Sequence, residues 1–209
     1  MHPIRIALTK GRLEKRAVEL FEAIGFDCSQ LHNKGRRLIL PMEGHEVVLA
    51  KGADVLTYIV HGACDVGIVG KDTIVEHGGS FYEMLDLGIG KCKFALAGPR
   101  GVDFYAGHHE RVIASKYPNV AKAFFEQKGM DVKVIKIEGS VELAPLLDFA
   151  HGVVDIVETG STLKENGLAV LEEIMPVSAR VIVNRASMKL RREEIEQLLH
   201  DIELAVQVN

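Results

Sequence analysis

The sequence predicts an α/β protein of two lobes joined by a double crossover, and three observations support this prediction. Short apolar strands alternate with segments of helical spacing in two successive series. Two unusually long extended passages, residues 85–99 and 168–183, would carry the chain across and back. A final amphipathic helix then remains to cap the first lobe. We expect a first lobe of residues 1–90 plus 180–209, a second lobe of residues 91–179, and a hinged cleft between them.

The first series begins with a short apolar strand at residues 4–8, followed by a helix whose apolar positions recur until Gly25. A turn-prone segment at residues 41–45 then joins two brief strands, which predicts a β-hairpin rather than a crossover. Lys71 and Asp72 open a short helix at the end of the series. We expect a mostly parallel sheet covered on both faces. The other expected elements are strands at residues 37–40, 47–50 and 65–70, and a helix at residues 53–61.

The second series predicts the same architecture again, although we find no internal sequence repeat. Its last strand, Val153 to Val157, leads into a loop of small residues and then a helix that begins near Thr162. The passage 168–183 would return the chain to the first lobe, where the final helix packs as a cap. The other expected elements are strands at residues 112–115 and 132–137, helices at residues 120–128 and 141–150, and a final apolar stripe of Ile195, Leu198, Leu199, Ile202 and Val206.

Charge and composition argue against several classes of protein. Lys plus Arg total 25 against 29 Asp plus Glu, and the net charge of −4 gives no electrostatic footprint for nucleic acid or an anionic membrane. The three cysteines are far apart, which argues against a disulfide framework or a zinc site and fits a reduced cytoplasm. The first residues lack a basic segment followed by an apolar run, and no apolar run elsewhere reaches membrane-spanning length, so neither export nor membrane insertion is expected. Adjacent His108 and His109 would point to opposite faces of a strand, so a histidine metal site is not expected.

The segment from Asp155 to Thr162 has the pattern of a phosphate-binding loop. Backbone N–H groups and hydroxyls of Thr159 to Thr162 would form an anion cradle suited to a phosphate monoester. Asp155 interrupts an apolar strand, where an unpaired carboxylate is costly to bury, so it should face a cleft or a ligand hydroxyl. An ordinary strand-to-helix turn with a Ser or Thr cap explains the loop equally well. These residues alone leave both interpretations open.

Three other strand ends carry polar residues with the same ambiguity. Lys10, Gly11 and Arg12 place two cations at a helix start, where a bound anion would compensate them, although a solvated turn beside a Thr cap is the alternative. Glu142 follows an apparent cap in the turn at residues 139–145, and a carboxylate is favoured there without any ligand. Asp72 is best explained as a helix cap. Residues 34–37, which include Lys34, Arg36 and Arg37, are expected to form a solvated loop, and Lys51 at a strand end is unremarkable in isolation.

Five segments, taken together, closely resemble the catalytic subunit of ATP phosphoribosyltransferase, and they follow in order over nearly the whole chain. The resemblance implies a fold like the type II periplasmic binding proteins. It also implies the first step of histidine biosynthesis, in which an adenine ring nitrogen of ATP attacks phosphoribosyl pyrophosphate (PRPP). The anomeric carbon is inverted, and the products are phosphoribosyl-ATP and pyrophosphate. The five segments are residues 7–13, 62–72, 86–92, 139–145 and 155–163.

The resemblance also implies roles for particular residues. Displacement at an anomeric carbon passes through an oxocarbenium-like state, so catalysis should come from positioning and from stabilising the leaving diphosphate, without a covalent nucleophile. Mg²⁺ would be held mainly by substrate phosphates, with no metal site of the protein's own. Lys51 departs from the family's usual Arg and lacks its bidentate fork. The expected residues are Lys10 and Lys51 for catalysis, Glu142, Asp155, Glu158, Thr159, Gly160, Ser161 and Thr162 for PRPP, and Lys10, Gly11, Arg12 and Asp72 for ATP.

The sequence stops soon after its last predicted helix, whereas long-form relatives carry a further C-terminal domain that binds histidine. We therefore expect the short form, a cytoplasmic hetero-oligomer whose regulatory subunit resembles histidyl-tRNA synthetase and binds histidine. Two other functions stay open from the residues themselves. One is a non-catalytic module that closes on a small phosphorylated or carboxylate ligand. The other is a different PRPP-dependent transferase, because an acid followed by a T-G-x-T loop suits that ligand in general.

Overall fold

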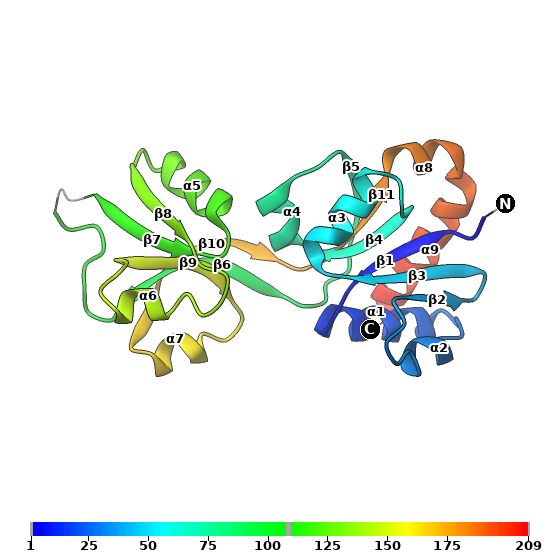
Figure 1. The fold of residues 1–209 in the computed structure, drawn as a ribbon, viewed down its shortest axis with the longest axis horizontal. Coiled ribbons are helices and arrows are strands. Elements are labelled where there is room, and N and C mark those ends of the chain that lie inside the picture. The colour runs from blue at the N-terminus through cyan, green and yellow to red at the C-terminus, as the bar shows by residue number, and fades with distance from the viewer. Residues whose placement is uncertain (1, 108–109, 209) are drawn as a thin grey trace. The chain divides into compact units, whose positions relative to one another are not determined.

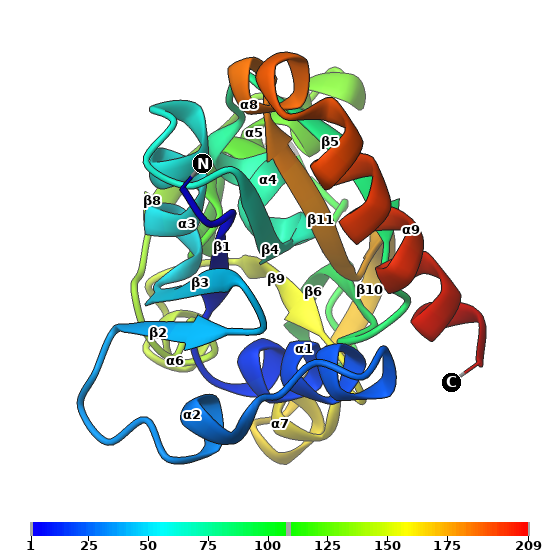
Figure 2. The same ribbon diagram turned by 90° about the vertical axis from the view of Figure 1, so that its right-hand side faces the viewer.

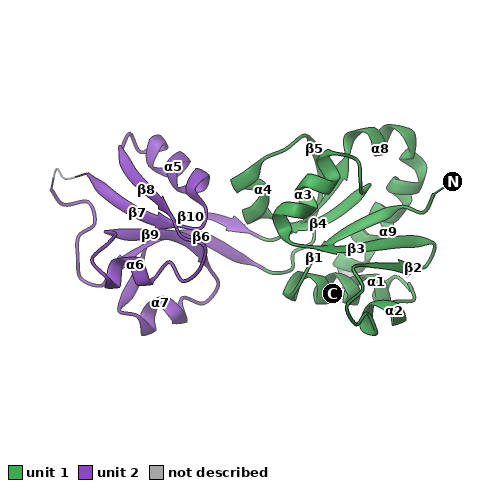
Figure 3. Ribbon diagram, viewed as in Figure 1, with its two compact units in different colours: residues 1–90, 178–209 green, residues 91–177 purple. Residues whose placement is uncertain are grey.

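The chain divides into two compact units in the computed structural model, which describes residues 2–107 and 110–208 (Figures 1 and 3). Unit 1 comprises residues 1–90 and 178–209, and unit 2 comprises residues 91–177. The chain thus passes between the units twice, as the double crossover requires. The second expected boundary, between residues 179 and 180, lies two residues later than this division. His108 and His109 lie outside the described residues.

Unit 1 contains a six-stranded sheet in the order β2-β3-β1-β4-β11-β5. Strand β1 runs parallel to β3 and to β4, whereas β2, β11 and β5 pair with their neighbours in antiparallel fashion. The sheet is therefore mixed rather than mostly parallel. The predicted hairpin is confirmed as β2 and β3. The strands are β1 (Arg5–Thr9), β2 (Ile39–Met42), β3 (His45–Ala50), β4 (Val66–Gly70), β5 (Phe81–Asp86) and β11 (Ala179–Asn184).

Helices cover both faces of this sheet, and two short ones were not predicted. Helix α2 is a single turn, too short for apolar periodicity to reveal. Helix α8 begins where the Asn184 side chain accepts hydrogen bonds from the backbone of Ala186 and Ser187, at 2.9 and 2.8 Å. This Asn cap was the available signal. The helices are α1 (Arg12–Ala23), α2 (Ser29–His32), α3 (Gly52–Val60), α4 (Lys71–His77), α8 (Arg185–Leu190) and α9 (Arg192–Val208).

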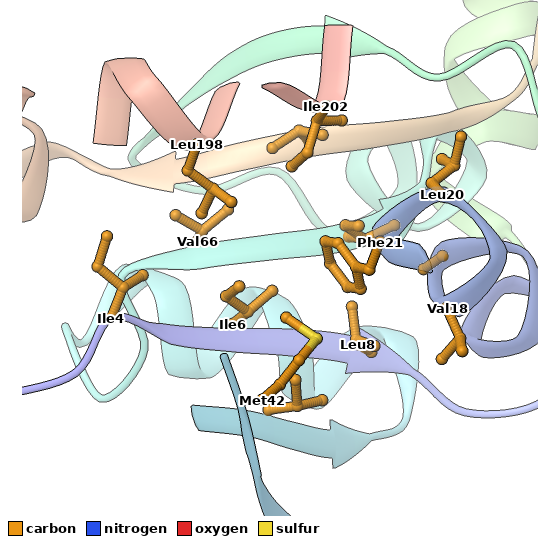
Figure 4. Packing of buried hydrophobic residues seen from close by; sticks show 14 of the residues in the cluster. Ile4, Ile6, Leu8, Val18, Leu20, Phe21, Met42, Val66, Leu198 and Ile202 are labelled. Carbon is orange, nitrogen blue, oxygen red and sulfur yellow. The ribbon is translucent and has the colours of Figure 1, made fainter. Parts of the chain in front are cut away.

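The main core of unit 1 lies between one face of the sheet and helices α1 and α9 (Figures 2 and 4). Alternation along β1 directs Ile6 and Leu8 to this core and Ala7 to the opposite face, against α3. Phe21 of α1 and Leu198 of α9 pack over the first of these faces. The prediction that the last helix caps the first lobe is confirmed.

Unit 2 contains a five-stranded sheet in the order β10-β6-β9-β7-β8. Strand β7 is parallel to β8 and to β9, while β6 pairs antiparallel with β9 and β10. The long passage expected at residues 85–99 is divided into the end of β5, a loop, and β6. The elements are β6 (Cys92–Pro99), β7 (Arg111–Ser115), α5 (Pro118–Gln127), β8 (Val132–Lys136), α6 (Leu143–Leu146), β9 (Gly152–Val157), α7 (Ser161–Glu165) and β10 (Leu168–Val177).

Helix α6 is much shorter than the helix predicted at residues 141–150. Pro145 lacks the N–H that a longer helix would need, and Asp148 adopts a left-handed φ of 54° that ends helical geometry. Sequence periodicity counted apolar residues here that in fact stay exposed, including Leu147 at 73%. The segment is therefore one helical turn followed by an irregular return to β9.

Candidate functional site

Three neighbouring parallel strands of unit 1 end at one edge of the sheet, and a lysine follows each. The register pairs Thr9 with Ala50 and Leu8 with Ile68, so the ends of β3, β1 and β4 lie in a row. The residues that follow are Lys51, Lys10 and Lys71. The structure therefore brings the two predicted catalytic lysines, Lys10 and Lys51, onto adjacent strand ends. A hydrogen bond of 2.8 Å from the Lys10 backbone N–H to the Ala50 carbonyl fixes this arrangement.

The carboxylate of Glu14 lies against the turn after β1, and the sequence analysis did not predict this contact. Gly11 adopts a φ of +100°, which side-chain-bearing residues rarely adopt, and its N–H lies 3.3 Å from Glu14 Oε2. Glu14 is only 6% exposed and also pairs with the Lys34 ammonium. The Gly-x-x-Glu spacing of a capping box was the available signal. Lys34, expected in a solvated loop, is thus tied to the start of α1, while Lys10, Gly11 and Arg12 remain exposed.

Thr9 does not cap α1, so the alternative interpretation of this turn as a solvated turn beside a Thr cap is wrong on that point. Its hydroxyl donates to the Ile68 carbonyl at 3.0 Å and ties β1 to β4 at the sheet edge. Close packing also fixes the start of α4, because a Cβ on Gly70 would lie 2.0 Å from Oδ1 of Asp72. Asp72 is the second residue of α4, and the cap residue of that helix is Gly70, so Asp72 is not an N-cap side chain. The predicted ATP-binding residues therefore share this edge with Lys51.

The predicted PRPP residues of unit 2 gather on one side of its sheet. Strands β8, β7 and β9 are parallel, so the turns after β8 and β9 leave from the same edge. Asp155 lies on β9 between Val153 and Val157, whose side chains share one buried cluster with Val141. Because alternate residues of a strand point to the same face, half-buried Asp155 faces the side that carries Glu142 and α7. The structure thus brings Glu142, Asp155 and the following turn to one face.

The turn after β9 is small and exposes hydroxyls. Gly160 has a left-handed φ of 76°, and α7 begins at Ser161, one residue before the predicted start. The hydroxyls of Thr159 and Ser161 lie 3.0 Å apart, and the Ser161 N–H lies 3.4 Å from Thr159 Oγ1. No side chain of the cap residue bonds the helix, since that residue is glycine. Glu158, Thr159, Ser161 and Thr162 are all exposed at this edge and can meet a ligand.

The described residues contain neither a cluster of metal ligands nor a membrane-spanning helix. No group of three His, Cys, Asp or Glu side chains there could hold a metal ion. The oxygen donors of Glu142 and Asp155 are nevertheless of the type that Mg²⁺ takes alongside phosphate oxygens and water. None of the described helices is long and apolar enough to cross a membrane. All three cysteines are free thiols, and burial raises the pKa of Cys28 and Cys64 to about 11.

Two α/β units linked by a double crossover, each with a polar edge at parallel strand ends, define the class of two-lobed binding folds. The periplasmic aliphatic sulphonate binding protein SsuA from Escherichia coli matches 99% of this chain and 73% of its own, with a TM-score of 0.60 at 12% identity. This likeness shows the fold alone. The predicted fold class, two lobes like those of periplasmic binding proteins, is confirmed.

Sequence comparison then identifies the family. The model of the HisG family, ATP phosphoribosyltransferase, matches residues 51–204. An ATP phosphoribosyltransferase of Clostridium kluyveri is 58% identical over 208 residues, which cover 99% of this chain and 94% of that protein. A chain of the ATP phosphoribosyl transferase (HisG:HisZ) complex from Thermotoga maritima is 32% identical, with a TM-score of 0.86 over 99% of this chain and 100% of its own. The chain belongs to the ATP phosphoribosyltransferase family, glycosyltransferases of the first step of histidine biosynthesis.

Proposed function

We propose that this chain is the catalytic subunit that transfers the phosphoribosyl group of PRPP to an adenine ring nitrogen of ATP. The reaction inverts the anomeric carbon and yields phosphoribosyl-ATP and pyrophosphate. The single observation that carries the residue assignment is the shared face of Glu142, Asp155 and the 158–162 turn in a chain of this family. The other two functions considered from the residues, a ligand sensor and a different PRPP transferase, have no comparable support.

PRPP binding is assigned to the edge of unit 2. Donors of the 159–162 turn hold the 5-phosphate, because exposed hydroxyls and backbone N–H groups suit a phosphate monoester. Glu142 and Asp155 accept hydrogen bonds from the ribose hydroxyls, and charged acceptors make such bonds strong. Glu158 directly follows β9 and lies at the same edge. These contacts fix the ribose while its anomeric carbon reacts.

ATP and the leaving diphosphate are assigned to the lysine edge of unit 1. Lys10 and Lys51 are exposed, and neither forms an ion pair with another described residue. Cations are needed here because the diphosphate gains negative charge as its bond to the sugar breaks. Gly11 lets a phosphate approach the backbone closely, while Arg12 and Asp72 border the same edge.

Positioning and charge stabilisation are sufficient for this displacement. The transition state resembles an oxocarbenium ion, so the protein has to hold the adenine nitrogen and the anomeric carbon in line and neutralise the leaving group. Mg²⁺ would be bound mainly through diphosphate oxygens, and it would supply further charge neutralisation there. No side chain is assigned as a nucleophile.

A regulatory subunit is part of this proposal. The Thermotoga maritima structure is a HisG:HisZ complex, which supports a hetero-oligomer for this chain as well. We assign histidine binding to that partner, which would resemble histidyl-tRNA synthetase. The reduced state of Cys28, Cys64 and Cys92 fits a cytoplasmic site of action.

The test is reconstitution with purified components. The chain, Mg²⁺, PRPP and ATP are mixed with and without the candidate partner, and both pyrophosphate release and absorbance of the adduct are followed. We expect turnover that depends on both substrates, with histidine inhibition only when the partner is present. Absence of turnover in both mixtures would overturn the assigned activity, and inhibition of the chain alone by histidine would overturn the division of roles.

A further inference from the structure

The third lysine of the unit 1 edge was not among the predicted site residues. Lys71 directly follows β4, as Lys10 follows β1 and Lys51 follows β3. The register aligns Lys51 with Lys10 and places Lys71 one residue beyond the level of Lys10, at the end of the adjacent strand. Resting on the proposed function, we propose that Lys71 is a further diphosphate-binding residue, held by Glu83 in the free chain and released to a bound diphosphate.

The partner of Lys71 is shared with a second cation. Lys71 Nζ lies 2.6 Å from Glu83 Oε2, and the guanidinium of Arg180 lies 3.4 Å from the other oxygen, Oε1. Arg180 also pairs with Asp86 at 2.9 Å. Glu83 therefore keeps a cation when Lys71 leaves, and no carboxylate is left without a counter-charge.

Arg180 can hold Glu83 without help from Lys71. Its Nη1 faces Glu83 and its Nη2 faces Asp86, so the guanidinium serves both carboxylates at once. A carboxylate that keeps one charged donor avoids the full cost of an unpaired buried charge, which lowers the cost of releasing Lys71.

Only the side chain of Lys71 has to move. Its backbone N–H donates to the Ser178 carbonyl at 2.9 Å, which anchors the main chain at the strand end. The side chain is 24% exposed and leans toward β5, where Glu83 lies two strands away from β4. Strand β1, with Lys10 at its end, adjoins β4 on the opposite side, about 5 Å away. The flexible four-carbon stem of a lysine covers such a distance.

Calorimetric titration with pyrophosphate and Mg²⁺ tests this without turnover. Lys71→Met should weaken pyrophosphate binding about tenfold, while Lys71→Arg should stay within about threefold of the parent chain. Glu83→Gln removes the competing carboxylate charge and should tighten binding about threefold. Lys93→Met, which removes an ion pair with Glu173 in unit 2, is the matched control and should bind as the parent does. Melting temperatures verify that every variant is folded.

The outcomes separate this inference from the proposed function. Unchanged binding by Lys71→Met, or weaker binding by Glu83→Gln, would show that the Lys71 pair is only structural and would overturn the inference. Turnover by the parent chain without measurable pyrophosphate binding would also overturn it. If the parent chain neither binds pyrophosphate nor releases it from PRPP and ATP, the proposed function itself fails.

Discussion

In unit 1 the strand order β3-β1-β4-β11-β5 consists of three parallel strands followed by two that alternate in direction, and in unit 2 the order β8-β7-β9-β6-β10 repeats this pattern. The residues after the parallel strands differ. In unit 1 they are Lys51, Lys10 and Lys71, whereas in unit 2 the turns after β8 and β9 carry Glu142 and Glu158, and a lysine, Lys116, follows only β7. One architecture therefore presents a series of lysines at the parallel strand ends of unit 1 and mainly carboxylates and hydroxyls at those of unit 2.

Within each unit, a hydroxyl at the end of the central parallel strand forms a hydrogen bond to the neighbouring parallel strand. Thr9, at the end of β1, donates its hydroxyl to a carbonyl of β4 at 3.0 Å. Ser115, at the end of β7, donates to the Val154 carbonyl of β9 at 2.6 Å and accepts from the Tyr117 N–H at 2.9 Å. A hydroxyl at the end of the central strand thus fixes the neighbouring parallel strand in each unit. Ser115 makes one bond more than Thr9 and is fully buried.

The largest expected effect comes from removing one carboxylate, Asp155, from the polar strand ends of unit 2. Asp155→Asn keeps the size of the side chain but removes its charge, so kcat/KM for PRPP should fall about 100-fold. Steady-state kinetics with varied PRPP measure this loss, and the melting temperature should change little because Asp155 is only half-buried. Asp148→Asn, in the exposed segment before β9, is the matched control. Unchanged kinetics for Asp155→Asn would remove this residue from the site.

The second expected effect sharpens the comparison of the two hydroxyl ties. Ser115→Ala leaves a buried carbonyl and a buried N–H without their partner, so the free energy of unfolding should fall by about 2 kcal/mol. Thr9→Val removes a single bond at a half-buried position and should cost about 1 kcal/mol or less. Urea denaturation followed by linear extrapolation measures both values. Equal losses would mean that the two ties do not differ as their bonds suggest.

A smaller effect concerns the lysine edge alone. Lys51→Arg introduces the residue that the family commonly has, and its planar fork can bind two phosphate oxygens at once. Pyrophosphate affinity measured by calorimetry should therefore rise about threefold. Lys15→Arg, on the exposed surface of α1, provides the control for a general charge effect. A decrease in affinity would indicate that the edge is shaped around a lysine at this position.

Apolar patterns in the sequence were sufficient for most of the scaffold. The strand at Ile6 to Leu8 and the stripe of Leu198 on the last helix each bury one face, and period alone reveals such faces. Strand β5 was missed because it is an edge strand whose residues are exposed or only half-buried. Helix α6 was overestimated because Pro145 and the left-handed Asp148 act locally against an apolar pattern.

The candidate site was less accessible to sequence reasoning, since its geometry depends on contacts between distant residues. Lys10 and Lys51 are 41 positions apart in the sequence, and only the register of β1 with β3 makes them neighbours. The pairing of Lys71 with Glu83 requires β11 to lie between β4 and β5, which no local pattern predicts. Motif order predicts which residues belong to the candidate site, whereas strand register gives the arrangement of those residues in the structure.

The smallest expected effect concerns the pH dependence of stability, which has a different source in each unit. Burial, and then the nearby charge of Arg191, lower the pKa of His45 in unit 1 below its ordinary value of 6.5, while Glu194 and Glu43 oppose this. In unit 2, hydrogen bonds from Lys128 and Tyr105 lower the pKa of Glu172 below its ordinary value of 4.5. Both groups therefore contribute to the free energy of unfolding, and both contributions are lost on acidification. As the pH falls, each group takes up its proton in the unfolded chain before it does so in the folded protein, and the two groups do this in different pH ranges.

Above pH 6.5 His45 is neutral in the folded protein and in the unfolded chain, so its full contribution to the free energy of unfolding is present. This contribution is lost as the pH falls through the pKa of His45 in the folded protein. Glu172 keeps its contribution until the pH falls below 4.5. His45→Phe preserves a ring against Phe26, whose centroid lies 5.4 Å away, and cannot take up a proton. Urea unfolding at pH 7 and pH 5.5 should therefore show a smaller loss of stability for His45→Phe than for the parent chain. Equal losses in the two proteins would mean that His45 does not set the acid response of unit 1.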